Sequence, residues 1–220
     1  MIDLYSWNTA NGRKIAILLE ELKLPYRYHP VDITNGEQFS AEFVALNPNS
    51  KIPAIIDSDG PDGQPITIIE SGAIMIYLAD KAHSSLNPTD PRQRVNVLEW
   101  LMFQMGGVGP NFGQALHFYK YAKEKVPYGI ERYMTEFHRL CKVMDSRLQG
   151  RDYIAGDYSI ADISIYPWLA RWKWLDLDWA QYPNLERWFE AVSQRDAVKR
   201  GLEVLAELPA EYLQKTRVAA

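Results

Sequence analysis

Residues 49–54 read Asn-Ser-Lys-Ile-Pro-Ala. Pro53 cannot donate to a central β-ladder, so it marks a sheet edge or a tight bend, and it is compatible with a cis peptide bond after Ile52. Because the residue before a proline is pushed into an extended conformation, Ile52 is predicted to offer its backbone N–H and C=O to an extended, peptide-like ligand. The alternative is that Pro53 only shapes a loop.

Residues 70–74, Glu-Ser-Gly-Ala-Ile, follow shortly after and are predicted to open a helix. A helix start carries unsatisfied N–H groups and partial positive charge, so it can hold a carboxylate. The alternative is that Ser71 only caps the helix. An extended backbone and a carboxylate pocket, joined by one short hairpin, suit a small acidic peptide, and glutathione is the candidate.

The first eighty residues are predicted to alternate strands and helices. The expected strands are residues 2–5, 26–33, 54–56 and 66–69, and the expected helices are about 11–23, 39–46 and 71–81. This order, β-α-β-α-β-β-α, contains one crossover unit followed by a hairpin. It is the thioredoxin-like arrangement, an α/β fold.

After a polar connector that contains proline, the strand signals disappear and apolar residues recur at helical spacing. Ser159 and Asp162 form a capping box that starts one of these helices. The fold class is therefore α/β plus all-α. The predicted parts are a thioredoxin-like domain at 1–82, a linker at 83–90 and an all-helical domain at 91–220.

Composition limits the possible functions of this chain. With 220 residues, 47% hydrophobic and 24% charged, it is an ordinary packed protein. A net charge of −4 gives no reason to expect nucleic acid as a partner. No apolar run approaches the roughly 18 residues needed to cross a bilayer, so no membrane partner is expected either.

Cysteine and histidine usage narrows the chemistry further. One cysteine, Cys141, rules out an intrachain disulfide framework and fits a reducing cytosol. The N-terminus reads as a strand without a basic region or signal peptide, so a cytoplasmic location is expected. The four histidines show no metal-ligand spacing, and no metal is expected.

The chain resembles the cytosolic glutathione transferases over essentially its whole length. Segments 51–54 and 70–74 and the cap at 159–162 fall in that family's order. More narrowly, it is similar to the bacterial Nu class. The pieces that match this class are residues 9–12, 38–39, 104–110 and 127–133.

The resemblance implies a homodimer that binds glutathione in its first domain. The residues implied to hold the tripeptide are Gln38, Lys51, Ile52, Pro53, Glu70 and Ser71. Arg132 would reach a glutathione in the neighbouring subunit, and Gln104 would do the same. Each role is chemically sensible: Ser71 suits the γ-glutamyl carboxylate, Glu70 the adjacent ammonium, and Lys51 a second carboxylate. The alternative is that Lys51 and Arg132 are solvated surface charges.

The loop from Tyr5 to Gly12 must supply the group that faces the sulfur, and it contains no cysteine. Thr9 and Asn11 lie where the loop meets the first helix, and a hydroxyl and an amide beside a helix N-terminus favour thiolate over thiol. They are the candidate catalytic residues. The alternative for Asn11 is a simple helix cap. Cys141 lies on an apolar stripe and is expected to be buried and inert.

For Nu-like proteins the implied reaction is glutathione-dependent reduction of a small-molecule disulfide. The glycine-rich run at 106–110 either opens room for a second glutathione or lets two helices pack closely. One alternative is conjugation of glutathione to an electrophile or cleavage of an aromatic ether, along a wall built by Phe112, Phe118, Tyr119 and Tyr121. A different alternative is a non-catalytic, glutathione-binding regulatory module.

Overall fold

The computed structural model describes residues 1–206, which form two compact units. The first unit comprises residues 1–83 together with 196–206, and the second comprises residues 84–195. The predicted domain limits, 1–82 and 91–220, stay a prediction, and residues 207–220 lie outside the described part of the chain.

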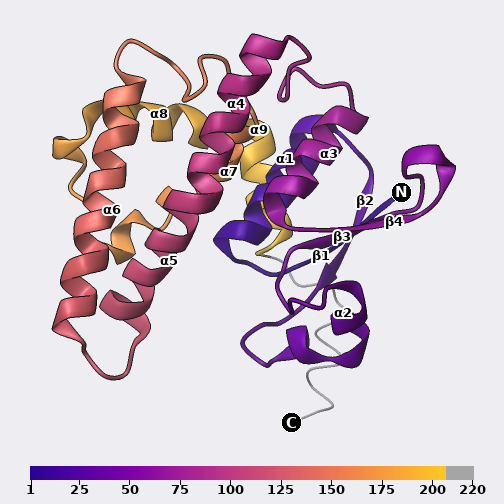
Figure 1. The fold of residues 1–220 in the computed structure, drawn as a ribbon, viewed down its shortest axis with the longest axis horizontal. Helices are drawn as coiled ribbons and strands as arrows, with labels where there is room; N and C mark the ends of the chain where they lie inside the picture. The colour runs from indigo at the N-terminus through magenta and orange to yellow at the C-terminus, as the bar shows by residue number, and fades with distance from the viewer. Residues whose placement is uncertain (207–220) are drawn as a thin grey trace. The chain divides into compact units, whose positions relative to one another are not determined.

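The first unit is built on a four-stranded mixed sheet (Figure 1). Its strands are β1 (Ile2–Ser6), β2 (Tyr26–Pro30), β3 (Ala54–Asp57) and β4 (Ile66–Ile69), in the order β2-β1-β3-β4. β1 pairs with β2 in parallel, and the β1–β3 and β3–β4 pairs are antiparallel. The helices are α1 (Ala10–Leu22), α2 (Ala41–Leu46) and α3 (Ser71–Lys81). The thioredoxin-like arrangement is confirmed.

The second strand is shorter than predicted, because β2 ends at Pro30 rather than at residue 33. The carboxylate of Asp32 accepts hydrogen bonds from the backbone N–H of Thr34 at 2.8 Å and from the Asn35 amide at 2.8 Å. Such a local turn gives the backbone an alternative to the sheet ladder. The chain therefore leaves the sheet early and turns toward α2.

The core of the first unit is centred on α1, whose residues 15–19 are all buried. α9 (Asp196–Val204) packs against α1, although it follows the helical part of the chain (Figure 1). A Cβ added at Gly201 would lie 2.6 Å from the Ile17 Cα, so only glycine lets the two helices approach this closely. Arg200 Nε lies 2.8 Å from Glu20 Oε2 and ties α9 to α1 at the surface.

The second unit is helical, as predicted. Its main helices are α4 (Pro91–Phe103), α5 (Gly109–Leu116), α6 (Pro127–Leu148), α7 (Ile160–Leu169) and α8 (Pro183–Ser193). A wide π-turn at residues 104–108 joins α4 to α5. A Cβ at Gly109 would lie 2.8 Å from the Gln104 amide nitrogen. The glycine-rich run thus forms an irregular helical turn, a usual cause of helix bending.

The predicted capping box is present at the start of α7 and is more extensive than the motif requires. Asp162 is fully buried, and its carboxylate accepts hydrogen bonds from the Ser159 N–H at 3.0 Å and the Ile154 N–H at 2.9 Å. Trp188 of α8 donates its indole N–H to the same carboxylate at 2.7 Å. One side chain therefore caps α7 and joins it to α8 and to the preceding loop.

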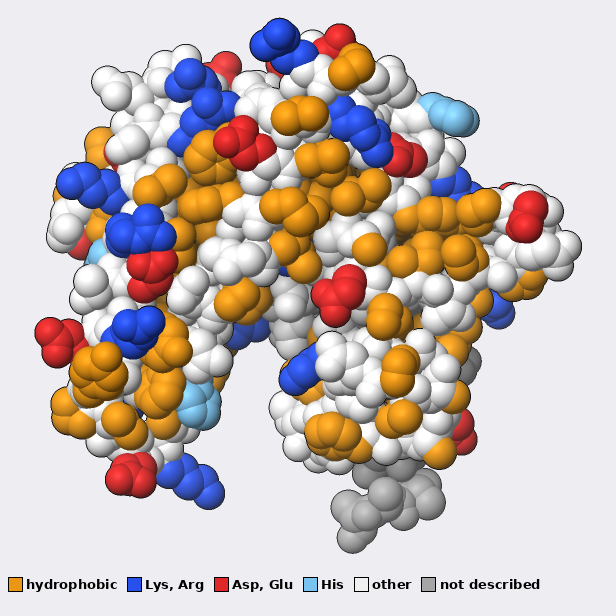
Figure 2. Space-filling view, in the orientation of Figure 1, with side chains coloured by type: hydrophobic (Ala, Val, Ile, Leu, Met, Phe, Trp, Pro, Cys, Tyr) orange, Lys and Arg blue, Asp and Glu red, His pale blue; other side chains and the backbone are white. Residues whose placement is uncertain are grey.

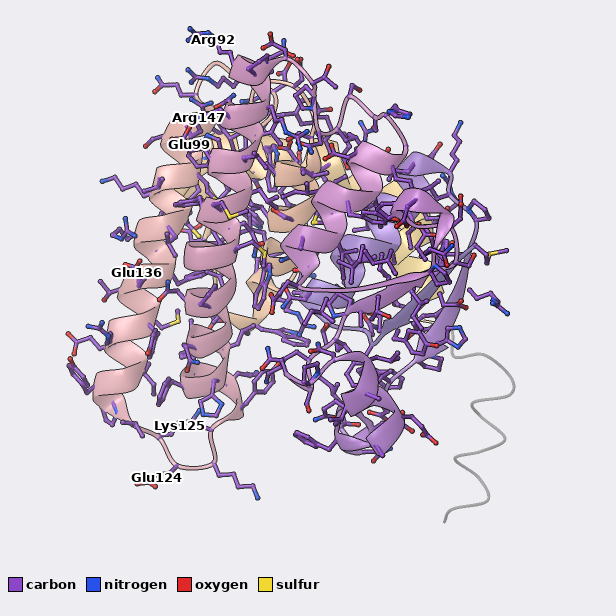
Figure 3. All side chains as sticks on the ribbon, turned by 45° about the vertical axis from the view of Figure 1, so that its right-hand side comes forward. Arg92, Glu99, Glu124, Lys125, Glu136 and Arg147 are labelled. Carbon is purple, nitrogen blue, oxygen red and sulfur yellow. The ribbon has the colours of Figure 1, made fainter. Side chains whose placement is uncertain are left out.

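Arg147 connects α6 to α4 within the second unit. Its guanidinium donates to Asn96 Oδ1 at 3.0 Å and to the Ile154 carbonyl at 2.9 Å, and it lies 5.1 Å from the centre of the Trp100 ring. Figure 3 shows Glu99 of α4 beside it. On the face of the molecule that Figure 2 shows, Lys and Arg side chains are interspersed with Asp and Glu.

Among residues 1–206, no helix combines the length and the apolar character that a membrane span requires. In the same range, no three His, Cys, Asp or Glu residues are grouped so that they could hold a metal ion.

Candidate functional site

Strand register brings the predicted binding segments to one end of the sheet. Tyr5, near the end of β1, pairs with Ala54 at the start of β3, which in turn pairs with Ile69 at the end of β4. The β1–α1 loop, the 50–53 loop and the start of α3 therefore emerge together. β2 runs parallel to β1, so the segment that carries Gln38 leaves the sheet at the same end.

Thr9 is the N-cap of α1, and this corrects the alternative that Asn11 caps the helix. Thr9 Oγ1 accepts a hydrogen bond from the Gly12 N–H at 3.1 Å. Gly12 is essential to this loop, because a Cβ there would lie 2.2 Å from the Trp7 carbonyl oxygen and 2.4 Å from Ser6 Oγ. The chain thus passes closely over the start of α1.

Asn11 lies in the first turn of α1 and is half-buried. Its side chain makes no hydrogen bond to another residue within the described part of the chain. Thr9 is also half-buried, and because its oxygen serves the helix, its O–H can donate elsewhere. The Asn11 amide and the Thr9 O–H can therefore both donate to a ligand, and together with the helix N-terminus they favour an anion.

The loop before β3 is held by a buried asparagine. Asn47 donates its side-chain amide to the Lys51 carbonyl at 2.6 Å and accepts from the Asn49 N–H at 2.9 Å. The Ile52–Pro53 peptide bond is cis, as the sequence allows. Pro53 is buried, Ile52 is half-buried and Lys51 is exposed. The backbone of Ile52 is fixed by this loop, just before the first ladder position of β3.

The start of α3 has an unusual backbone. Glu70 precedes the helix with φ 67° and ψ 114°, a conformation that non-glycine residues seldom adopt, and its side chain does not cap the helix. Glu70 is exposed, whereas Ser71, the first helical residue, is buried. The first turn of this eleven-residue helix therefore receives no side-chain cap from Glu70.

Sequence reasoning missed Lys14, which reaches this helix start from α1. It is only 1% exposed, and its Nζ lies 3.1 Å from Ser71 Oγ. Burial lowers the pKa of its ammonium to about 7, and Glu70 acts in the opposite direction. The signal in the sequence was its spacing, because buried Ile17 and Leu18 lie three and four positions further along α1.

Gln38 carries a buried amide oxygen, Oε1, that accepts no hydrogen bond from another residue in the described part of the chain. An unsatisfied buried acceptor typically costs about 1–3 kcal/mol. An N–H donor on a bound peptide would remove this cost. The side chain is therefore suited to a ligand with amide groups.

Gln104 and Arg132 belong to the second unit. Gln104 is buried in the π-turn before α5. Arg132 is exposed on α6 and lines a surface cleft of about 520 Å³ together with Asn111, Tyr128 and Glu136. The two residues therefore occupy different surroundings, one internal and one on the surface of α6.

Three other side chains that the sequence made candidates for a chemical or substrate-binding role pack against neighbouring residues instead. Cys141 is buried on α6, as expected, and burial raises the pKa of its thiol. Phe112 is fully buried against Phe137, with ring centres 4.6 Å apart, so its place in a substrate wall is wrong. Tyr5 stacks on His29 at 4.6 Å and does not belong to the loop.

The chain matches known proteins over most of its length. Models of the glutathione S-transferase N-terminal and C-terminal domains match residues 10–81 and 127–191. The chain is 44% identical to the disulfide-bond oxidoreductase YfcG of Escherichia coli, over 92% of this chain and 94% of that protein.

Two solved structures are similar throughout. A glutathione transferase family member from Pseudomonas fluorescens, with two glutathione bound, is 42% identical with a TM-score of 0.87, covering 92% of both chains. A Pseudomonas putida glutathione transferase, with one glutathione disulfide bound per subunit, has the same identity and TM-score and covers 92% of this chain and 91% of that one. The chain described here belongs to the glutathione S-transferase family.

Proposed function

We propose that this protein is a glutathione-dependent disulfide-bond reductase that uses no cysteine of its own. The observation that carries the proposal is the start of α1, where the Thr9 hydroxyl and the Asn11 amide lie beside a helix N-terminus. The single cysteine is buried elsewhere. The similarity to a disulfide-bond oxidoreductase and to structures that hold two glutathiones or one glutathione disulfide supports the same reading.

The binding roles follow from the chemistry of glutathione. The γ-glutamyl carboxylate accepts from the first N–H groups of α3 and from Ser71, and Glu70 faces the ammonium beside it. The backbone of Ile52, shaped by Pro53, pairs with the cysteinyl amide in the manner of an added strand. Lys51 attracts the glycyl carboxylate. Gln38 supplies its buried amide oxygen to a peptide N–H.

The thiolate of glutathione is the nucleophile in both steps. It attacks one sulfur of the substrate disulfide, forming a mixed disulfide and releasing one substrate thiolate, which takes up a proton. A second glutathione thiolate attacks the glutathione sulfur of the mixed disulfide and releases the other substrate thiolate. Two glutathione thiols are oxidised to glutathione disulfide, and the substrate gains two electrons. Thr9 and Asn11 serve by holding the attacking sulfur as an anion.

The assembly proposed for this protein is a homodimer in the cytoplasm. Arg132 lines an exposed cleft beside Tyr128, which is 72% exposed. Exposed aromatic and arginine side chains are enriched at protein interfaces. In the dimer Arg132 reaches a glutathione of the neighbouring subunit. The same role for Gln104 stays a prediction, since its side chain is buried in the π-turn. A cytoplasmic location agrees with a single reduced cysteine.

The test is turnover of bis(2-hydroxyethyl) disulfide by purified protein with glutathione, followed by coupled detection of glutathione disulfide. Two glutathione should be consumed for each substrate disulfide. The Cys141→Ala variant should retain the activity, because the thiol is buried. Loss of activity in a correctly folded Cys141→Ala variant would contradict the cysteine-free mechanism.

The same assay separates the alternatives. An electrophile such as 1-chloro-2,4-dinitrobenzene should be turned over much more slowly than the disulfide; the reverse order would favour a conjugating transferase. Tight glutathione binding with no turnover of disulfides, electrophiles or peroxides would favour the regulatory module.

A further inference from the structure

The first unit contains a cavity of about 370 Å³, a volume typical of small-molecule sites. It is lined by residues of β1, β2 and α2 and of the turn that joins β2 to α2. Tyr5 of β1 packs against the cluster that contains Phe43 of α2, so the cavity lies on the α2 face of the sheet, opposite α1 and α3 (Figure 1). None of its lining residues belongs to the set proposed to hold glutathione or its sulfur.

Much of this lining is apolar or aromatic. Val31 and Phe43 are buried, and Leu46 packs against them. The rings of Tyr5 and His29 are stacked, with their centres 4.6 Å apart and an angle of 13° between their planes. Apolar surface removed from water contributes about 25 cal/mol per Å², so such walls can hold the body of an organic ligand.

The charged groups of the lining are acidic. Glu37 and Glu42 both line the cavity, whereas none of its described lining residues is a lysine or an arginine. Glu42 is exposed and makes no ion pair or hydrogen bond with another residue among 1–206. Glu37 Oε2 accepts the Asp32 N–H at 2.7 Å, and its other oxygen accepts no hydrogen bond within the same range. The His29 ring is already paired, because its Nε2 lies 2.7 Å from Asp3 Oδ1. The unmatched charge of the cavity is therefore negative.

This negative charge is suited to an organic cation. No three His, Cys, Asp or Glu residues within 1–206 are grouped so that they could hold a metal ion, and those of the cavity are included. An ammonium group donates strong, charge-assisted hydrogen bonds to carboxylates and is attracted to the faces of aromatic rings. The apolar walls then add affinity only if the ammonium carries an apolar or aromatic body.

We propose that this cavity, named the α2 pocket, binds a small protonated amine with an aromatic body. The ammonium lies beside Glu37 and Glu42, and the body lies against Phe43 and the Tyr5–His29 stack. The proposal does not depend on the proposed function, because the transfer of sulfur described above uses none of these side chains.

Three related ligands test the chemistry, with calorimetry on the whole protein at pH 7. 2-Phenylethylamine carries both the charge and the ring, ethylamine carries only the charge, and 2-phenylethanol carries only the ring. 2-Phenylethylamine should bind at least about tenfold more tightly than either of the others. Equal binding of 2-phenylethanol would contradict the role of the carboxylates, and equal binding of ethylamine would contradict the role of the apolar walls.

Matched variants locate the site. The pocket variant is Glu37→Gln with Glu42→Gln, in which residue 37 keeps an acceptor for the Asp32 N–H. The control is Glu124→Gln with Glu190→Gln, which removes two exposed acids of the second unit. The pocket variant should bind 2-phenylethylamine about tenfold more weakly, and the control should bind it as the wild type does. Equal weakening in both variants would mean general attraction of a cation to an acidic protein and would overturn the proposal.

Two further measurements use only the wild-type protein. 2-Phenylethylamine should still bind protein saturated with S-methylglutathione; displacement would place the amine in the glutathione site and overturn the proposal. On adding the amine, the NMR signals of Phe43 and Leu46 should shift, whereas those of Phe137 and Leu140 in the second unit should not. Tighter binding of Nα-acetyl-lysine methylamide than of 2-phenylethylamine would also overturn the proposal, in favour of a lysine side chain from a protein partner.

Discussion

The backbone N–H of Gly12 donates to Thr9 Oγ1 over 3.1 Å, so the residue proposed to hold the sulfur also caps the helix beside it. The acceptor side of the hydroxyl serves α1, and its hydrogen serves the ligand. Structural and catalytic roles therefore coincide in one side chain, and a simple truncation would remove both. A substitution that keeps an N-cap acceptor at residue 9 but removes the hydrogen-bond donor separates the structural role from the catalytic one.

Thr9→Asp is such a substitution. Aspartate is as good an N-cap as threonine, so the free energy of unfolding should change by less than about 1 kcal/mol. Its carboxylate cannot donate at neutral pH and repels a thiolate, so disulfide turnover should fall at least about a hundredfold. Urea denaturation measures the free energy of unfolding, and steady-state kinetics measures the rate of disulfide turnover. Thr9→Ser, which keeps cap and donor, should remain active.

Asn11 should act through its amide donor alone. Asn11→Ala should lower kcat/KM by about tenfold to a hundredfold and raise the pKa of the bound glutathione thiol, because one donor to the anion is lost. Ultraviolet absorbance of the thiolate, titrated against pH, measures that pKa in the complex. An unchanged thiol pKa with reduced activity would assign Asn11 to substrate placement instead of sulfur activation.

The sequence predicts the sheet, the cis proline loop and the α7 cap because each depends on local signals. Thr9 as the cap was less visible, since Asn11 is an equally good capping residue two positions away. α9 was assigned to the helical part because periodicity does not reveal the partner of a helix. Gly201 within α9 was the available sign, as a glycine in a helix often marks close backbone approach.

Side chains that break the general rules were the hardest to predict. A lysine is expected in solvent, so the sequence pattern does not predict the burial of Lys14 among apolar residues. Among the tryptophans of the second unit, Trp188 is buried, whereas Trp174 is 43% exposed. Burial of a given aromatic depends on tertiary packing that composition does not encode.

Asp162 should be the most sensitive polar residue of the second unit. Asp162→Ala removes one acceptor from Ile154, Ser159 and the Trp188 indole at once, leaving buried donors unpaired. The free energy of unfolding should fall by about 3–5 kcal/mol, as measured by urea denaturation. Asp152→Ala is the matched control, because its ion pair with Arg187 is exposed and should be worth less than about 1 kcal/mol.

The buried ammonium of Lys14 should make stability depend on pH. Its pKa is lowered by burial from 10.5 to about 7. Between these values the unfolded chain binds this proton and the native protein does not, so the unfolded state holds more protons and stability rises with pH. The contribution of this one group is at most about 1.4 kcal/mol per pH unit.

The measurement is the difference in unfolding free energy between wild type and Lys14→Met, from urea denaturation at pH 6 to 10. Tyrosines and other groups titrate in both proteins and cancel in this difference. The wild type should gain on the variant as pH rises above 7, and the difference should be flat below pH 6. Lys123→Met should show no such slope, because its side chain is exposed. Parallel curves for wild type and Lys14→Met would mean that the pKa of the Lys14 ammonium is not lowered in the native protein.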